Sequence, residues 1–106
     1  HYDEDNCCHA LAIELTSRNH IVEEQVLVRR LYRGQPVGAD YLDLVVDGKV
    51  VLEIKKAARF APAHEDQART YLRDSGLAVG LLLYFGCETP IVKRLFEPGN
   101  VKPEEV

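Results

Sequence analysis

The chain contains 106 residues, 46% of them hydrophobic and 28% charged, and this composition predicts one soluble domain with its own core. No apolar run reaches the roughly 20 residues of a membrane helix, and no basic-then-apolar leader precedes the first predicted element, so we expect neither membrane insertion nor export. The three cysteines are an odd number and two are adjacent, which argues against a disulfide framework and favours the reducing cytoplasm.

Charge is distributed unevenly along the chain. The formal net charge of −4 argues against nucleic acid as a partner, because phosphate binding depends on lysine and arginine. Residues 29–73 nevertheless contain nine basic and six acidic residues. The middle of the chain therefore permits an interaction with nucleic acid that the total charge disfavours.

The first predicted element is a helix over residues 3–19. Apolar residues recur there at the spacing of a helix face that packs on a core, at Cys8, Leu11, Ala12 and Leu15. Glu4 lies on the same stripe, four residues before Cys8. An acid on a buried face requires a partner, so Glu4 is a candidate functional residue.

Three strands are predicted next, over residues 21–31, 37–46 and 49–56. A turn at Gly34, Gln35 and Pro36 separates the first two strands. The second and third form a hairpin around Asp47-Gly48, because this dipeptide between two apolar runs is a strong hairpin signal.

A second helix is predicted over residues 63–75. It follows Pro62, which suits the start of a helix, and Gly76 is expected to end it as a C-terminal cap. Residues 77–85 are almost purely apolar, which predicts a strand that is buried on both faces. A last short strand is predicted over residues 91–96.

The resulting element order is α-β-β-β-α-β-β. It predicts an α/β fold in which helices flank a mixed sheet. We expect this domain to occupy residues 1–97 and an irregular C-terminal tail to occupy residues 98–106.

The third predicted strand carries the pattern Glu53-Ile54-Lys55, and Asp43 lies on the strand before it. Alternation places Glu53 and Lys55 on one face of the sheet. A carboxylate in the middle of a sheet is costly unless it is paired or binds a metal. Two carboxylates and a backbone carbonyl, that of Ile54, form the hard oxygen site that Mg²⁺ prefers, and Lys55 can orient a water or stabilise charge on a phosphate. The alternative is a surface hairpin with ordinary charged residues.

The hairpin loop tests the metal-site hypothesis. A two-residue turn at Asp47-Gly48 would pair Asp43 with Leu52 and direct its side chain away from Glu53. A three-residue loop or a bulge would return both carboxylates to one face, because a slip of one residue reverses every side chain of a strand. The hypothesis therefore requires a loop of odd length, with Gly48 as its left-handed residue.

Several stretches resemble the GxxExxY proteins, a bacterial and archaeal branch of the PD-(D/E)XK nuclease superfamily. The matching stretches are residues 10–15, 32–38, 43–55, 64–67 with Tyr71-Leu72, and 76–82. The resemblance implies a restriction-endonuclease-like core in which Asp43 and Glu53 bind a divalent metal and Lys55 assists catalysis. In the motif that names the family the glutamate is Glu4, which implies a role in binding or orienting metal. His1 and Cys7 stand where that motif has glycine and tyrosine.

Further candidates surround these residues. Gln67 matches a polar residue that follows the E-x-K strand in several nuclease branches, where its amide would hold the attacking water or a phosphate. It could equally be an ordinary flank of an apolar helix stripe. Lys56 and Arg59 directly follow the predicted metal site and are candidate nucleic-acid-binding residues.

A zinc site is the main competing interpretation of the cysteines. The candidates would be Cys7, Cys8, His9 and Cys87. Consecutive residues of a helix point about 100° apart, so three of them cannot converge on one ion, and no C-x2-C spacing occurs. Buried free thiols are the prediction instead.

These observations favour a Mg²⁺- or Mn²⁺-dependent nuclease that acts on nucleic acid, DNA rather than RNA. A homodimer with two-fold symmetry is expected, because a domain this small offers little surface to hold a duplex. The alternatives are a non-catalytic module that binds nucleic acid or protein with the same fold, and a regulatory subunit of a larger assembly.

Overall fold

The computed structural model describes the whole chain except residues 1–2, 58, 60, 87–88 and 106. Its elements run in the expected order: α1 Glu4–Ser17, β1 Val22–Tyr32, β2 Gln35–Val46, β3 Val50–Lys56, α2 Pro62–Ser75, β4 Val79–Phe85 and β5 Ile91–Phe96, followed by two 3-10 turns at Pro98–Asn100 and Pro103–Glu105. The helix and strand positions agree with the sequence-based expectation to within two residues at each end.

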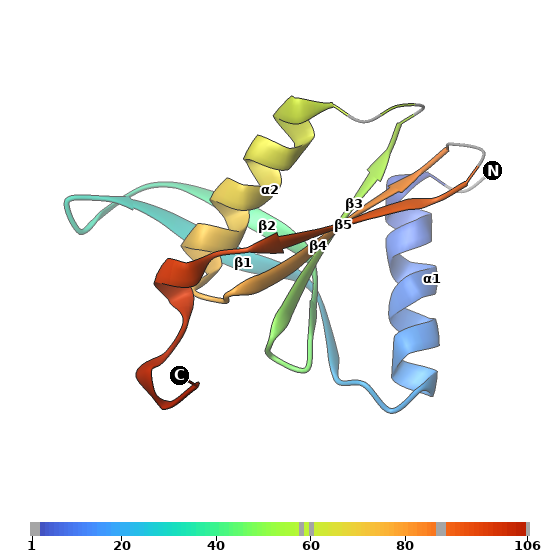
Figure 1. Ribbon diagram of the computed structural model, residues 1–106, viewed down its shortest axis with the longest axis horizontal. Helices are drawn as coiled ribbons and strands as arrows, with labels where there is room; N and C mark the ends of the chain where they lie inside the picture. Colours follow the sequence, from blue (N-terminus) through green and yellow to red (C-terminus); the bar gives the residue numbers. More distant parts are fainter. Residues whose placement is uncertain (1–2, 58, 60, 87–88, 106) are drawn as a thin grey trace.

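The five strands form one sheet in the order β1-β2-β3-β4-β5 (Figure 1). All neighbours are antiparallel except β3 and β4, which are parallel because α2 connects them. The predicted mixed α/β sheet is therefore confirmed.

Two hydrophobic clusters cover the two faces of this sheet. The cluster under α1 contains Cys8, Ala12, Leu44, Val46, Leu52 and Ile54. The cluster under α2 contains Leu42, Val45, Val51, Ala68, Leu72, Leu82, Tyr84 and Leu95. The α1 stripe that the sequence predicts packs as expected, and β4 contributes side chains to both layers, which explains its continuous apolar sequence.

β1 and β2 bend together at Gln25 and Asp43. Leu42 belongs to the α2 layer and Leu44 to the α1 layer, although residues two apart in a regular strand share a face. Gln25 has a φ of 52°. In the register of β1 and β2, Glu24 pairs with Leu44 and Val26 pairs with Leu42, and the pair between them, Gln25 and Asp43, is missing. The bend divides the β1–β2 hairpin into a covered half, in which 22–24 pair with 44–46, and an arm, residues 27–41. The arm projects past α2 (Figure 1).

The loop between β2 and β3 has the odd length that the metal-site hypothesis requires. Val46 pairs with Val50, so Asp47, Gly48 and Lys49 form a three-residue loop. Gly48 has a φ of 63°, as expected, and Asp47 is also left-handed at 54°. The Asp47 carboxylate accepts a hydrogen bond from the Ile21 N–H at 2.8 Å, which ties the loop to the start of β1.

The last residues dock against the end of α2, a segment expected to be irregular. The Asn100 side-chain amide donates hydrogen bonds to the carbonyls of Leu72, Arg73 and Leu77 at 3.1, 3.1 and 2.9 Å. Carbonyls at a helix end lack partners within the helix, and here Asn100 adds a donor to the Leu72 and Arg73 carbonyls, which also accept from the Ser75 hydroxyl and the Gly76 N–H. Among the described residues, no helix has the length and apolar character needed to cross a membrane.

Candidate metal centre

The candidate centre lies where β2 separates from β3. The last paired residues are Leu44 and Leu52, and the next position along the same register places Asp43 opposite Glu53. At this position, hydrogen bonds to carboxylate side chains take the place of the backbone hydrogen bonds between the two strands. The Ile54 N–H donates to the Asp43 carboxylate at 2.8 Å, and the Asp43 N–H approaches Glu53 Oε1 at 3.4 Å. The odd loop thus brings the two predicted carboxylates together on one face.

Burial gives this carboxyl pair unusual electrostatics. Glu53 is 5% exposed and is the buried charged residue of the described chain. Burial, and then the neighbouring charge of Asp43, raise the pKa of Glu53 from 4.5 to about 8. Burial also raises the pKa of Asp43, and the hydrogen bond from Ile54 opposes that shift. A carboxyl pair of this kind, with Glu53 buried and Asp43 half-buried, is stabilised by a positive charge, which a divalent cation supplies.

Lys55 is half-buried and shares the face of Glu53 by strand alternation. Its charge lowers the pKa of both carboxyl groups, although burial outweighs that effect. Ile54, between them, turns its side chain into the α1 layer and directs its N–H to Asp43. The predicted ligation through the Ile54 carbonyl stays a prediction.

Glu4 lies beside the centre, at the start of α1. Its Oε1 accepts a hydrogen bond from the Lys56 N–H at 2.8 Å, which joins the helix start to the end of β3. Its charge contributes to the raised pKa of Asp43. The side chain is nevertheless exposed, and the described residues contain no group of three histidine, cysteine or acidic side chains placed to hold one ion. A direct ligand role for Glu4 therefore stays a prediction.

Sequence and structure comparisons place this geometry in a known family. A family model for the PD-(D/E)XK nuclease superfamily matches residues 2–95. The chain belongs to this superfamily. No curated protein matches the sequence. The finer resemblance to the GxxExxY proteins stays a prediction, and His1 of that motif lies outside the described residues.

Solved structures support the superfamily fold. The crystal structure of SSO0001 is 22% identical, with a TM-score of 0.58 over 85% of this chain and 50% of that chain. An alkaline exonuclease from Laribacter hongkongensis, LHK-Exo, is 16% identical, with a TM-score of 0.60 over 86% of this chain and 54% of that chain. The chain therefore spans about half the length of both structures, and at these identities the likeness concerns the fold alone.

Helix α2, which follows the E-x-K strand, carries the predicted candidate Gln67 and a further candidate, Tyr71, that was not assigned from the sequence. Gln67 has an exposed side chain. Tyr71, one turn later, is half-buried, and burial together with the charges of Asp40 and Glu53 raises its pKa. Its position four residues after Gln67, on the same side of the helix, was the signal that could have identified it.

The basic candidates lie at the exit of β3. Lys56 has an exposed side chain, while its backbone N–H is bound to Glu4. Arg59 is exposed in the connection to α2. Both side chains are accessible to a ligand, and their predicted role in binding nucleic acid stays a prediction.

The cysteines that the structure describes are free thiols, and of these two the predicted burial holds for Cys8 and not for Cys7. Cys7 is half-buried and Cys8 is buried. The Cys8 Sγ donates to the Asp43 carbonyl at 3.7 Å, and burial raises the pKa of the thiol to about 12. Cys8 therefore supports the backbone of Asp43 from the α1 side, and Cys87 lies outside the described residues.

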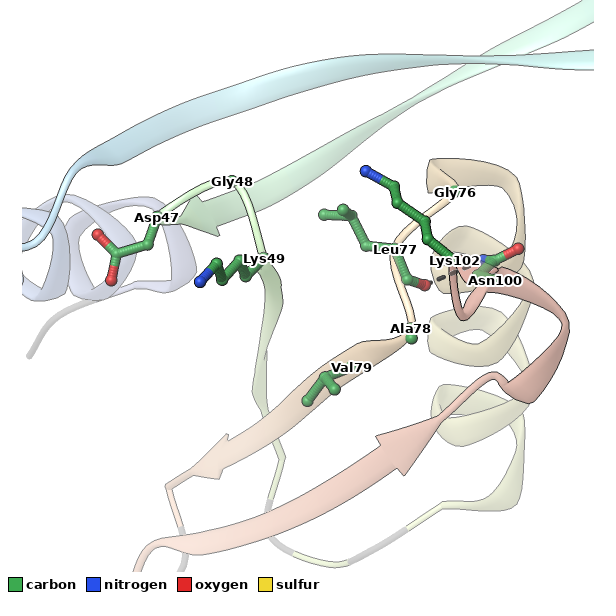
Figure 2. Close-up of a pocket in the computed structure, with 9 residues that line it drawn as sticks. All are labelled: Asp47, Gly48, Lys49, Gly76, Leu77, Ala78, Val79, Asn100 and Lys102. Atoms are coloured by element: carbon green, nitrogen blue, oxygen red, sulfur yellow. Dashed lines mark hydrogen bonds between the residues drawn. The ribbon is translucent and has the colours of Figure 1, made fainter. Parts of the chain in front are cut away.

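A cavity of about 470 Å³ lies away from the centre. Figure 2 shows it between the β2–β3 loop and the end of α2, with Lys49 and Lys102 among its lining residues. Lys49 precedes β3, whereas Lys55 lies near the end of that strand. None of the predicted site residues lines this cavity.

Proposed function

We propose that this chain is a Mg²⁺- or Mn²⁺-dependent nuclease that hydrolyses phosphodiester bonds. The observation that carries the proposal is the placement of Asp43 and Glu53 opposite each other in the gap between β2 and β3, with Glu53 buried. Membership of the PD-(D/E)XK nuclease superfamily supports it. A buried carboxylate such as Glu53, beside a second carboxylate and without a functional partner, would only reduce stability.

The residues of the centre fit a hard divalent cation. Asp43 and Glu53 would hold the ion through carboxylate oxygens, which is the donor type that Mg²⁺ and Mn²⁺ prefer. When bound, such an ion supplies a Lewis acid beside the phosphate. Because burial raises the pKa of Glu53 to about 8, most molecules carry a proton on this side chain at neutral pH, and ion binding would release it.

Lys55 would act on the substrate from the same face. Its ammonium group can donate a hydrogen bond to a phosphate oxygen and stabilise the charge that develops as water attacks phosphorus. The new bond joins the water oxygen to phosphorus, and the bond to the leaving oxygen breaks. Gln67 and Tyr71 on α2 lie on the side of the sheet where Glu53 and Lys55 point, and they would position the water or the phosphate.

The direct test is a calorimetric titration with Mn²⁺, combined with a cleavage assay on single-stranded and duplex DNA and RNA. We expect wild type to bind Mn²⁺ and to cleave nucleic acid, and we expect Glu53→Gln to do neither. Glu23→Gln, an exposed acid on β1, is the matched control and should behave as wild type. Unchanged Mn²⁺ binding by Glu53→Gln would refute the metal centre.

A non-catalytic binding module is the second candidate. It is favoured by the described residues, which contain no group of three histidine, cysteine or acidic side chains placed to hold one ion. Nucleic-acid binding without cleavage at any tested Mg²⁺ or Mn²⁺ concentration would support this candidate over the nuclease.

For the assembly, we propose a homodimer with two-fold symmetry that acts on DNA in preference to RNA. β5 is the last strand of the described sheet, and it exposes Ile91, Val92 and Phe96. An uncovered apolar edge strand favours self-association. Light scattering that gives the mass of a single 12.0 kDa chain at high concentration would contradict the dimer.

A further inference from the structure

The arm of the β1–β2 hairpin has one face that no helix covers. Val26 and Val28 of β1 pack against the α2 layer, as Leu42 of β2 does. By strand alternation, the residues between them face away from α2. The face so defined, here called the open face, contains Leu27, Arg29, Ala39 and Tyr41. Figure 1 shows the arm extending beyond the body of the fold.

The open face combines an exposed aromatic ring with a neighbouring cation. Tyr41 is 58% exposed and pairs across the strands with Leu27, which is 46% exposed. Arg29 pairs with Ala39, so it lies diagonally beside Tyr41. Such diagonal neighbours are about 7–8 Å apart, within reach of long side chains. The residue opposite Arg29 is the small Ala39, which is also exposed.

The tip of the arm also places a cation beside an exposed aromatic ring. The guanidinium of Arg33 lies over the ring of Tyr32, 5.7 Å from its centroid. A cation–π contact of this kind holds the guanidinium near the ring face, and its N–H groups can still donate to an anion. Tyr32 itself is exposed.

These two arginines differ from most others in the protein. Arg30, on the other face of the arm, is bound to Asp40. Ion pairs likewise connect Arg18 with Glu14 and Arg69 with Glu65. Arg29 and Arg33, in contrast, make no ion pair with any residue of the described chain. In a protein with a net charge of −4, the arm therefore presents uncompensated positive charge.

We propose that the arm binds single-stranded nucleic acid. Arg29 and Arg33 contact backbone phosphates, and Tyr41 stacks on an unpaired base. Proteins that bind single strands combine aromatic platforms with cations that follow the backbone, and only unpaired bases offer their faces for stacking. The inference rests on the proposed nuclease function and deepens it, because it names the substrate class that the centre receives.

The arm begins close to the centre. Tyr41 precedes Asp43 by two residues on β2, a distance of about 7 Å along the strand. The arm extends from there to Gln35, roughly 20 Å farther from the centre. The open face lies on the side of the sheet away from α2, whereas Glu53 and Lys55 point toward α2, so a strand held on the arm must pass to the other side of the sheet to reach the centre.

The competing occupant of the open face is a second copy of this chain. In a two-fold dimer the same patch meets itself, so Arg29 and Arg33 of each copy would approach the same positive charges of the other copy. Like charges at an interface are unfavourable unless acids compensate them, and on the open face and tip no acid pairs with them. Phosphates supply the missing negative charge.

The test measures binding of a labelled oligothymidylate by fluorescence anisotropy, in EDTA so that no cleavage occurs. We expect Tyr41→Ala to weaken binding about fivefold or more, the effect of losing one stacked base. The double variant Arg29→Ala/Arg33→Ala should reduce the slope of log K against log salt by roughly 1.4, because each phosphate contact to a single strand contributes about 0.7. A duplex of the same sequence should bind less tightly and respond less to Tyr41→Ala.

The controls are substitutions of exposed residues away from the arm. Ile13→Ala removes an apolar side chain that is 59% exposed on α1, and Arg94→Ala removes an exposed arginine from β5. Both should leave binding unchanged. The proposal is overturned if the arm variants bind as wild type, or if they change the mass of the particle in light scattering and leave the affinity unaltered.

The experiments distinguish failure of the arm proposal from failure of the nuclease proposal. If the arm variants lose binding while wild type cleaves nothing with Mg²⁺ or Mn²⁺, the arm is supported and the nuclease function fails. If cleavage depends on Glu53 while the arm variants bind normally, the nuclease function stands and the arm proposal fails.

Discussion

The two halves of the β1–β2 hairpin share the same strands and the same antiparallel pairing, but they lie in different environments. In the covered half, Leu44 and Val46 are buried under α1. In the arm, Leu27 and Tyr41 are exposed. The bend at Gln25 and Asp43 separates the two, and Asp43 lies at the boundary. One hairpin can therefore hold Asp43, a candidate metal ligand, at the border of a buried layer and extend an exposed surface beyond it.

The largest expected difference between the two halves is in how much a truncated side chain lowers the free energy of unfolding. Leu44→Ala in the covered half leaves a cavity beneath α1, and we expect it to lower the free energy of unfolding by about 2–5 kcal/mol. Leu27→Ala on the arm should change it by roughly 0.5 kcal/mol or less, because surface substitutions seldom exceed that. Urea denaturation of both variants measures the difference. Equal losses would mean that the arm is part of the cooperative core.

Catalysis should depend on the boundary between the halves and not on the loop that closes the covered half. Lys55→Ala removes a cation beside the carboxyl pair, and we expect cleavage to fall about 10²–10³-fold. Lys49→Ala, in the loop before β3, is the matched control and should retain activity. Comparable activity of the two variants would show that Lys55 has no catalytic role.

The pH dependence of stability should report the buried carboxylate at the boundary. Because the pKa of Glu53 rises from 4.5 to about 8 on folding, the folded state holds a proton that the unfolded state has released between those values. Stability in EDTA should therefore decrease as pH rises from about 4.5 to about 8, by up to about 1.4 kcal/mol per pH unit, and this contribution should level off above pH 8.

Glu53→Gln provides the control for that pH dependence, since an amide does not titrate in this range. The variant should have a flatter stability profile between the same pH values. A wild-type profile that rises with pH across this window would contradict the raised pKa of Glu53.

The smallest effect is expected at Glu4, which lies beside the boundary. Glu4→Gln keeps an acceptor for the Lys56 N–H and removes the charge near Asp43. We expect Mn²⁺ affinity to fall about tenfold, as for residues that support metal ligands, with the fold intact. Unaltered affinity in a calorimetric titration would show that Glu4 only fastens the start of α1 to β3.

Much of the fold could be predicted from the sequence because the signals are local. The 3.6-residue stripe of α1 and the Gly76 cap of α2 lie within single elements. The candidate metal centre could be predicted for the same reason, because strand alternation alone puts Glu53 and Lys55 on one face. The requirement for an odd loop was also deducible, although the choice of three residues over two depended on the left-handed Asp47 as well as Gly48.

Other features depend on contacts between distant segments, which leave little trace in local patterns. Tyr71 approaches Glu53 only because α2 crosses back over the sheet to connect two parallel strands. Asn100 binds the end of α2 from a segment whose composition resembles an irregular tail. The exposure of Glu4 likewise depends on where α1 begins relative to the end of β3, so its place on an apolar stripe did not imply burial.

The sequence by itself determined which residues alternate, where the helices begin and end, and which carboxylates are available for a metal. Only the tertiary structure decided that β1 and β2 bend together at Gln25 and Asp43. The bend follows from packing: Leu44 must enter the α1 layer and Leu42 the α2 layer, and a regular strand with a period of two cannot send both to opposite faces. That packing requirement brings Asp43 into the gap beside Glu53 and leaves the arm uncovered.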